Sequence, residues 1–146
     1  MFTKILVPLD GSDKSLEALD FASNIAKTYD AEIFLLSVFK KYSFLEGSFA
    51  SLNSSIDKGN LEDVLRESSK EIVSEGKEIL KEKGITKVRA FVKMGSAAKE
   101  ILKFRKENDI DLIIIGSKGQ GELSGYLLGG VSHKVTGLAK CPVMVV

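Results

Sequence analysis

Short apolar runs alternate along this chain with longer segments in which apolar residues recur every three or four positions. The apolar runs are typical of buried strands, and the three- and four-residue spacing is typical of helices that turn one face toward a core. Five such runs are separated by four such helical segments. Because each parallel strand pair needs a connection long enough for a helix, the alternation predicts a doubly wound α/β fold, with a five-stranded, mostly parallel sheet and helices on both faces.

The predicted elements follow one another at regular intervals. The predicted strands are Lys4–Leu9, Ala31–Phe39, Thr86–Met94, Asp109–Ile115 and Pro142–Val146. The predicted helices are Leu16–Tyr29, capped by Ser12 or Asp13, then Leu61–Lys83, Ala97–Phe104 and Val131–Ala139. The second strand is almost continuously apolar, as expected for an interior strand, whereas the third alternates apolar and polar residues. Between the second strand and the second helix, Lys40–Asn60 predicts a long connection that is either a functional lid or disordered.

The length and the net charge of the chain argue against several classes of protein. A chain of 146 residues is expected to form one domain, 1–146, with a core that needs no metal or disulfide. The net charge of +1 gives no general attraction to nucleic acid or to anionic membranes, and every apolar run is too short to cross a bilayer. Cys141 has no disulfide partner, and no secretory leader precedes the first strand, so we expect a cytoplasmic protein with Cys141 buried and inert.

A glycine-rich segment, 116–132, lies between the fourth predicted strand and the last predicted helix. Glycines let the backbone approach a ligand closely, and a helix start presents N–H groups that suit phosphate. The alternative is a flexible surface loop, but the position at the carboxyl end of a central strand favours phosphate binding. Two common phosphate motifs are absent: Lys118-Gly119 reverses the order that a P-loop needs, and Gly119, Gly121 and Gly125 are spaced one residue too widely for a dinucleotide fingerprint.

Gly116, Gly119 and Gly129 instead match the spacing of Gly, two residues, Gly, nine residues, Gly. This pattern resembles the nucleotide-binding members of the universal stress protein family. The opening segment 5–12, the strand-to-helix segment 95–97 and the closing segment 141–146 are also similar to that family, so the resemblance covers the whole chain. It implies the strand order 3-2-1-4-5, a stress-response function, and ATP as ligand, with or without Mg²⁺.

The resemblance also implies the residues that hold the nucleotide. Those expected around adenine and ribose are Pro8, Asp10 and Val38, and those expected along the sugar and phosphates are Ile115, Gly116 and Gly119. Those expected to hold the triphosphate are Gly129, Gly130, Val131 and Ser132. From the residues alone, Asp10 also fits a turn and cap residue, and Lys118 either neutralises phosphate or only keeps the loop soluble.

Gly130 departs from the family pattern, which has a Ser or Thr hydroxyl at this position. The missing contact to a charged group is worth about 1–3 kcal/mol, so weakened nucleotide binding is expected. Ser132 offers a hydroxyl two residues later.

Three functional hypotheses remain open at this point. The first is a regulatory protein that binds ATP, changes its conformation or partner surface and hydrolyses ATP slowly at most, because no residue is a convincing general base. The second is an ATP-cleaving enzyme of the PP-loop kind, using Gly11, Ser12 and Ser15 for pyrophosphate. The third is an interaction module that has lost nucleotide binding through Gly130. No catalytic or metal-binding residue is assigned, and the lone His133 fits a surface or packing residue.

The last predicted strand is apolar at almost every position and, in the implied order, lies at a sheet edge. An open apolar edge favours pairing with another strand. We therefore expect a symmetric homodimer in which two copies of Pro142–Val146 meet antiparallel, besides a protein partner that the sequence does not identify. The alternative is that the long helix or the connection Lys40–Asn60 covers this edge.

Overall fold

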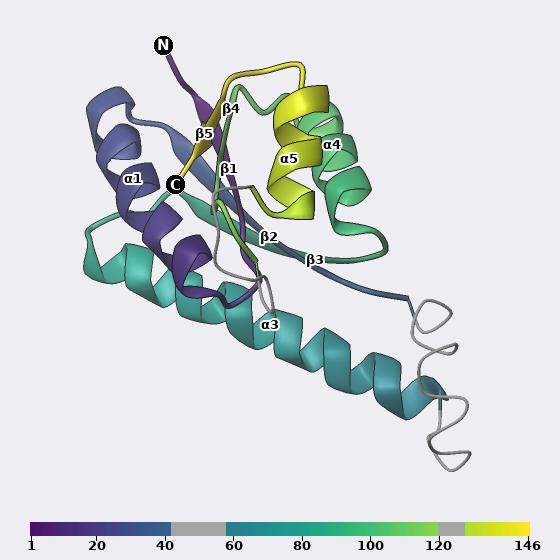
Figure 1. Cartoon of the computed structure of the whole chain (residues 1–146). Helices are drawn as coiled ribbons and strands as arrows, with labels where there is room; N and C mark the ends of the chain where they lie inside the picture. The colour runs from purple at the N-terminus through teal and green to yellow at the C-terminus, as the bar shows by residue number, and fades with distance from the viewer. Residues whose placement is uncertain (42–57, 120–127) are drawn as a thin grey trace.

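The computed structural model describes residues 1–41, 58–119 and 128–146, with the side chains of residues 58 and 59 excepted. Five strands form one sheet in the order β3-β2-β1-β4-β5, and every neighbouring pair is parallel (Figure 1). Helices α1 and α3 cover one face, and α4 and α5 cover the other. The predicted α/β fold and strand order are therefore confirmed.

The strands are β1 Lys4–Pro8, β2 Glu32–Phe39, β3 Val88–Met94, β4 Leu112–Ile115 and β5 Val143–Val145. The helices within the described residues are α1 Asp13–Tyr29, α3 Lys58–Glu82, α4 Ala97–Glu107 and α5 Gly130–Leu138. The predicted fourth strand began too early, because Asp109 has a φ of 53° and the chain is still turning there. Most of the predicted connection Lys40–Asn60 and the middle of the glycine-rich segment, 120–127, lie outside the described residues.

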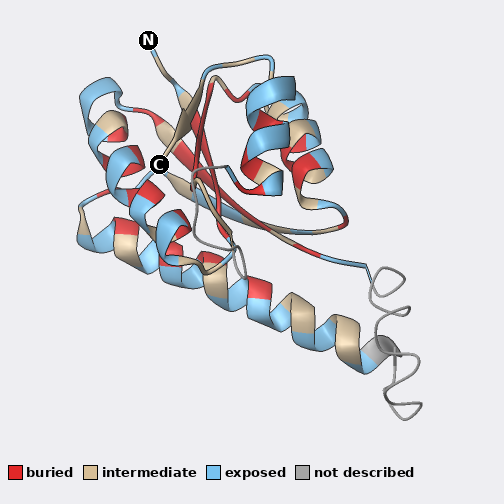
Figure 2. Ribbon diagram, in the orientation of Figure 1, coloured by how far each residue is buried: buried red, intermediate tan, exposed pale blue. Residues whose placement is uncertain are grey.

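The sheet carries a core on each face, because successive side chains of a strand point to opposite sides. On β1, Ile5 and Val7 join the core under α1 and α3, whereas Leu6 joins the core under α4 and α5. Figure 2 shows the central strands β1, β2 and β4 largely buried between helices whose outer faces are exposed. Leu9 and Ser12 connect β1 to α1, and the Ser12 side chain caps the helix by accepting a hydrogen bond from the Ser15 N–H.

The two sheet edges differ in their chemistry. The β3 edge carries the exposed cations Arg89 and Lys93, which discourage pairing with another strand. The β5 edge, Val143–Val145, carries no charge. Helix α3 packs against β2 and β3, at the opposite side of the sheet, so it does not cover the β5 edge. Residues 42–57, the other segment that sequence analysis considered for that role, are not described.

Close packing of α3 on the sheet depends on Gly76. A Cβ atom there would lie 2.7 Å from Leu9 Cδ1 and 3.2 Å from Leu35 Cδ1. We expect Gly76→Val to lower the free energy of unfolding by about 1–3 kcal/mol, because the core must shift to accept the larger side chain. Ser74→Val is the matched control, since Ser74 is exposed on the same helix. Urea unfolding of both variants tests this prediction. Equal free energies of unfolding for the two variants would show that the core accepts the larger side chain at position 76 without loss of stability.

Candidate functional site

A pocket opens where β1 and β4 end, at the point where the strand order reverses. It encloses about 540 Å³ of empty space when its open mouth is included. Nine of the ten residues implied by the sequence resemblance line it: Pro8, Asp10, Val38, Ile115, Gly116, Gly119, Gly129, Val131 and Ser132. Gly130 does not line it directly, although it begins α5 beside the pocket.

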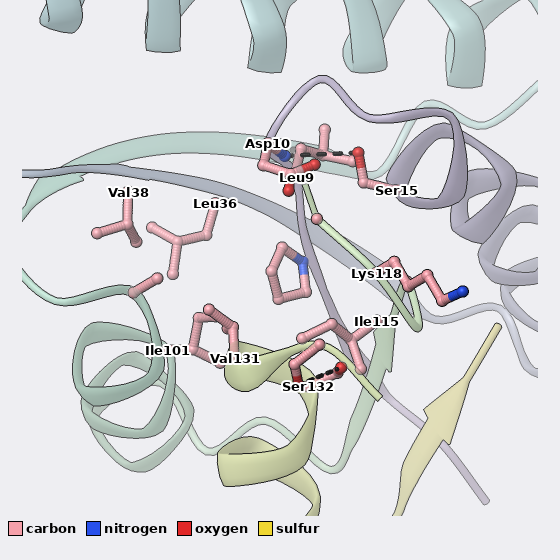
Figure 3. A pocket seen from close by; sticks show the side chains of 15 residues that line it. Leu9, Asp10, Ser15, Leu36, Val38, Ile101, Ile115, Lys118, Val131 and Ser132 are labelled. Carbon is pink, nitrogen blue, oxygen red and sulfur yellow. Dashed lines mark hydrogen bonds between the residues drawn. The ribbon is translucent and has the colours of Figure 1, made fainter. Parts of the chain in front are cut away.

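One side of this pocket is apolar. In Figure 3, the side chains of Leu36, Val38, Ile101 and Val131 stand together, and Pro8 also lines the pocket. Asp10 and Lys118 lie away from this apolar wall. Such a wall suits a flat, weakly polar group, and the charged side chains suit the polar part of the same ligand.

Sequence reasoning did not find the contribution of α4 to this wall. Ala97 and Ile101 both line the pocket, one turn apart on α4. The available signal was the Gly95-Ser96 break, which places the first turn of α4 directly after the carboxyl end of β3. The pocket also includes Leu9, Ser15 and Leu36.

The turn between β1 and α1 holds Asp10 in place. Asp10 Oδ1 accepts a hydrogen bond from the Ser12 N–H at 2.9 Å, and the Asp10 N–H donates to Ser15 Oγ at 3.4 Å. Ser15 Oγ in turn donates to the Ser12 carbonyl at 3.0 Å. Asp10 is thus a turn residue and a pocket residue at once. Ser12 and Ser15, which the PP-loop hypothesis assigns to pyrophosphate, both serve this turn.

Two glycines of the motif lie in tight contacts. At Gly116, a Cβ would lie 2.9 Å from the carbonyl carbon of Lys14 and 3.0 Å from the Ser15 nitrogen, so β4 passes close to the start of α1. At Gly119, a Cβ would lie 2.6 Å from Asp10 Oδ2. Glycine at 116 therefore permits this close approach, and glycine at 119 leaves room for the Asp10 carboxylate.

The start of α5 faces the same pocket. The Gly129 N–H donates to the Ser117 carbonyl at 2.8 Å, so this amide has an internal partner. The Ser132 hydroxyl is 2% exposed and lies within donating distance of the Ser117 carbonyl, at 3.0 Å, and of the Gly129 carbonyl, at 3.1 Å. The N–H groups of Val131 and Ser132 belong to the first turn, where a helix supplies no acceptor of its own. They can therefore serve an anion at the positive end of the helix.

Other groups considered from the sequence lie apart from the pocket. His133 is exposed on α5, and Cys141 is partly rather than fully buried just before β5. Burial raises the pKa of the Cys141 thiol, with Asp111 adding to the rise and Arg105 opposing it, so the thiol stays protonated at neutral pH. The described part of the chain contains no cluster of three metal-binding side chains, and none of its helices is long and apolar enough to cross a membrane.

Known proteins share both the sequence and the fold. A model of the universal stress protein family matches residues 1–146. Universal stress protein YxiE of Bacillus subtilis is 37% identical over 149 residues, which cover 100% of this chain and 99% of that protein. UspA from Lactobacillus plantarum has the same fold, with a TM-score of 0.84, 23% identity and coverage of 99% of this chain and 97% of UspA.

Two solved structures with this fold hold nucleotides. A universal stress protein in complex with cAMP has a TM-score of 0.70 at 24% identity, covering 99% of this chain and 96% of that protein. A universal stress protein from Archaeoglobus fulgidus in complex with dAMP has a TM-score of 0.69 at 18% identity, covering 99% and 97% of the two chains. At these identities the likeness establishes the fold.

Proposed function

The chain belongs to the universal stress protein family, and we propose that it is a regulatory stress-response protein that binds an adenine nucleotide, with ATP as the principal ligand. The observation that carries this proposal is the meeting of nine expected residues, from four separate parts of the chain, around one pocket. The cAMP and dAMP complexes of proteins with the same fold support the ligand class.

Different parts of the pocket suit the adenine, the ribose and the phosphates of the nucleotide. The apolar wall of Val38, Ile101 and Val131 suits the faces of adenine. The Asp10 carboxylate accepts hydrogen bonds from ribose hydroxyls, which are donors in need of an acceptor. The phosphates lie at the N–H groups of the first turn of α5, where Ser132 contributes its backbone and not its hydroxyl. Lys118 also lines the pocket and brings a positive charge to it.

Regulation fits this pocket better than fast turnover. Asp10 and Lys118 are the charged side chains that line it among the described residues, and Asp10 Oδ1 already accepts a hydrogen bond from the Ser12 N–H. Mg²⁺ would be held by the phosphates of the nucleotide itself, as is usual for this cation. We therefore propose a nucleotide-dependent switch in conformation or partner binding, with slow hydrolysis at most.

Isothermal titration of the protein with ATP, ADP, AMP and cAMP, each with and without Mg²⁺, tests the proposal. We expect saturable binding of one nucleotide per chain. No heat at millimolar nucleotide would leave the interaction module as the better hypothesis. Rapid release of pyrophosphate on addition of acceptor substrates would favour the ATP-cleaving enzyme instead.

Restoring a hydroxyl at position 130 is expected to strengthen ATP binding about tenfold, the effect of one hydrogen bond to a charged phosphate. The exchange is sterically free, because a Cβ at Gly130 meets no atom within 4 Å among the described residues. Gly137→Ser is the matched control, since Gly137 lies on the same helix with equally open space. Titration should show a gain for Gly130→Ser that is larger with ATP than with adenosine; an equal gain for both ligands would place the hydroxyl away from the phosphates.

We also propose that β5 pairs with β5 of a second copy. Hydrogen bonds from the Ile113 N–H to the Pro142 carbonyl and from the Val146 N–H to the Ile115 carbonyl turn alternate residues of this segment toward β4. The N–H and C=O groups of Val143 and Val145 therefore point away from the sheet. In an antiparallel pair, Val143 of each chain would lie opposite Val145 of the other chain. The edge is therefore self-complementary about a two-fold axis.

Helix α1 also carries exposed apolar surface. Ile25 packs against the same core cluster as Met144, and Phe21, one turn earlier on α1, is 44% exposed. A stable dimer buries about 1,200–2,000 Å², more than a three-residue strand supplies, so the α1 surface would contribute to the interface.

A further inference from the structure

The backbone of Ser117 lies between the nucleotide pocket and the β5 edge. Its N–H donates to the main-chain oxygen of Val146 at 2.7 Å. Its carbonyl lies 2.8 Å from the Gly129 N–H and 3.0 Å from the Ser132 hydroxyl, both at the start of α5. One residue thus joins the turn that faces the pocket to the residue that follows β5.

These bonds continue the β4–β5 ladder past the end of β4. The Val146 N–H donates to the Ile115 carbonyl at 2.9 Å, and the Ser117 N–H closes the next step. The N–H and the main-chain oxygen of Val146 are therefore both bonded to the segment that runs from β4 into the pocket. Val145 is the residue before Val146 and is one of the two residues whose N–H and C=O point outward. The hydrogen bonds at Val146 therefore restrict the position of Val145.

The carbonyl of Ser117 links this segment directly to the start of α5. The Ser117 carbonyl accepts two hydrogen bonds from the α5 turn, and the Ser132 hydroxyl that makes one of them is buried. These hydrogen bonds link the turn, Ser117 and Val146, so the order of each depends on the order of the others. A phosphate that orders the first turn of α5 would also order Ser117 and, through it, the edge.

We propose that Ser117 couples the pocket to the β5 edge, so that nucleotide binding and pairing with a second copy strengthen each other. The inference rests on the proposed function, because it needs both the nucleotide and the dimer. Each event lowers the ordering cost of the other, which gives positive coupling without a large change in structure. Linkage requires the two effects to be equal: the factor by which nucleotide tightens the dimer is the factor by which dimerisation tightens nucleotide binding.

Sedimentation equilibrium of the full chain, alone and with saturating ATP, measures the first factor. We expect the dimer dissociation constant to fall about tenfold with ATP, within the usual range of coupling between sites. Titration of ATP into the dimer and into a Val145→Pro monomer measures the second factor, which should be the same. Nucleotide binding with an unchanged dimer dissociation constant overturns the coupling alone, whereas no nucleotide binding overturns the proposed function.

The route is tested by Ser132→Ala, which removes the hydroxyl bond to the Ser117 carbonyl. We expect the tenfold effect of saturating ATP on dimerisation to shrink to less than threefold. Thr136→Val is the matched control, because its hydroxyl donates to the Ser132 carbonyl at 2.6 Å within α5 and does not reach Ser117. Full coupling in Ser132→Ala would overturn this route, and lost coupling in Thr136→Val would reduce it to a general property of α5.

Discussion

Gly119→Ala is expected to weaken nucleotide binding by about 10- to 100-fold while leaving the fold intact. The added methyl group would lie 2.6 Å from Asp10 Oδ2, too close for both atoms to keep their places. The carboxylate is the end of an exposed side chain, so it can rotate away from the methyl group at the cost of the hydrogen bond from the Ser12 N–H. Once displaced it no longer meets the ribose, and the loss of hydrogen bonds to a charged group is worth about 1.5–3 kcal/mol.

The matched control for this variant is Gly137→Ala, where a Cβ meets no described atom within 4 Å. Titration calorimetry with ATP measures the affinity of both variants, and thermal unfolding without ligand checks that neither has lost its fold. Wild-type affinity in folded Gly119→Ala would remove Asp10 from the binding site and leave it as a turn residue only.

The sequence carried most of the fold because its signals were local and repeated. Continuous apolar character placed β2 in the interior, and alternation placed β3 where one face is less covered; the structure has them as an interior and an edge strand. Boundaries were less predictable. Asp109 reads as part of an apolar run, yet its left-handed φ of 53° makes it part of the turn before β4.

The pocket could be predicted as far as it follows strand ends and glycines. Those residues lie at one edge of a parallel sheet by topology alone. Ala97 and Ile101 were missed because helical spacing marks a buried face without saying whether that face meets the core or a pocket. Asp10 shows a different limit: the turn and the pocket interpretations were treated as rivals, but a short side chain with two oxygens serves both.

The role of Ser117 has no sequence signal of its own. Its contacts are made by the backbone N–H and C=O, which every residue except proline carries. Only the three-dimensional arrangement brings the end of β5, the end of β4 and the start of α5 to this residue. The proposed coupling between the pocket and the β5 edge therefore rests on the fold and could not have been inferred from the sequence.

Val145→Pro is expected to convert the proposed dimer to a monomer with little loss of monomer stability. Proline removes a backbone N–H, and at an edge strand this is tolerated where that N–H points away from the sheet. The bonds at Pro142 and Val146 face β4, so the N–H of Val145 faces outward and the β4–β5 ladder keeps its own bonds. In a two-fold pair each proline would delete one hydrogen bond and place its ring against the other strand.

The control for this variant is Val145→Thr, which keeps the N–H and nearly the same shape. Light scattering across protein concentrations should give a dimer for wild type and Val145→Thr, and a monomer for Val145→Pro. The argument depends on which way one N–H points, so it separates strand pairing from burial of apolar side chains alone. A dimer that survives in Val145→Pro must be held by another surface, and the exposed Phe21 on α1 would then be the first place to look.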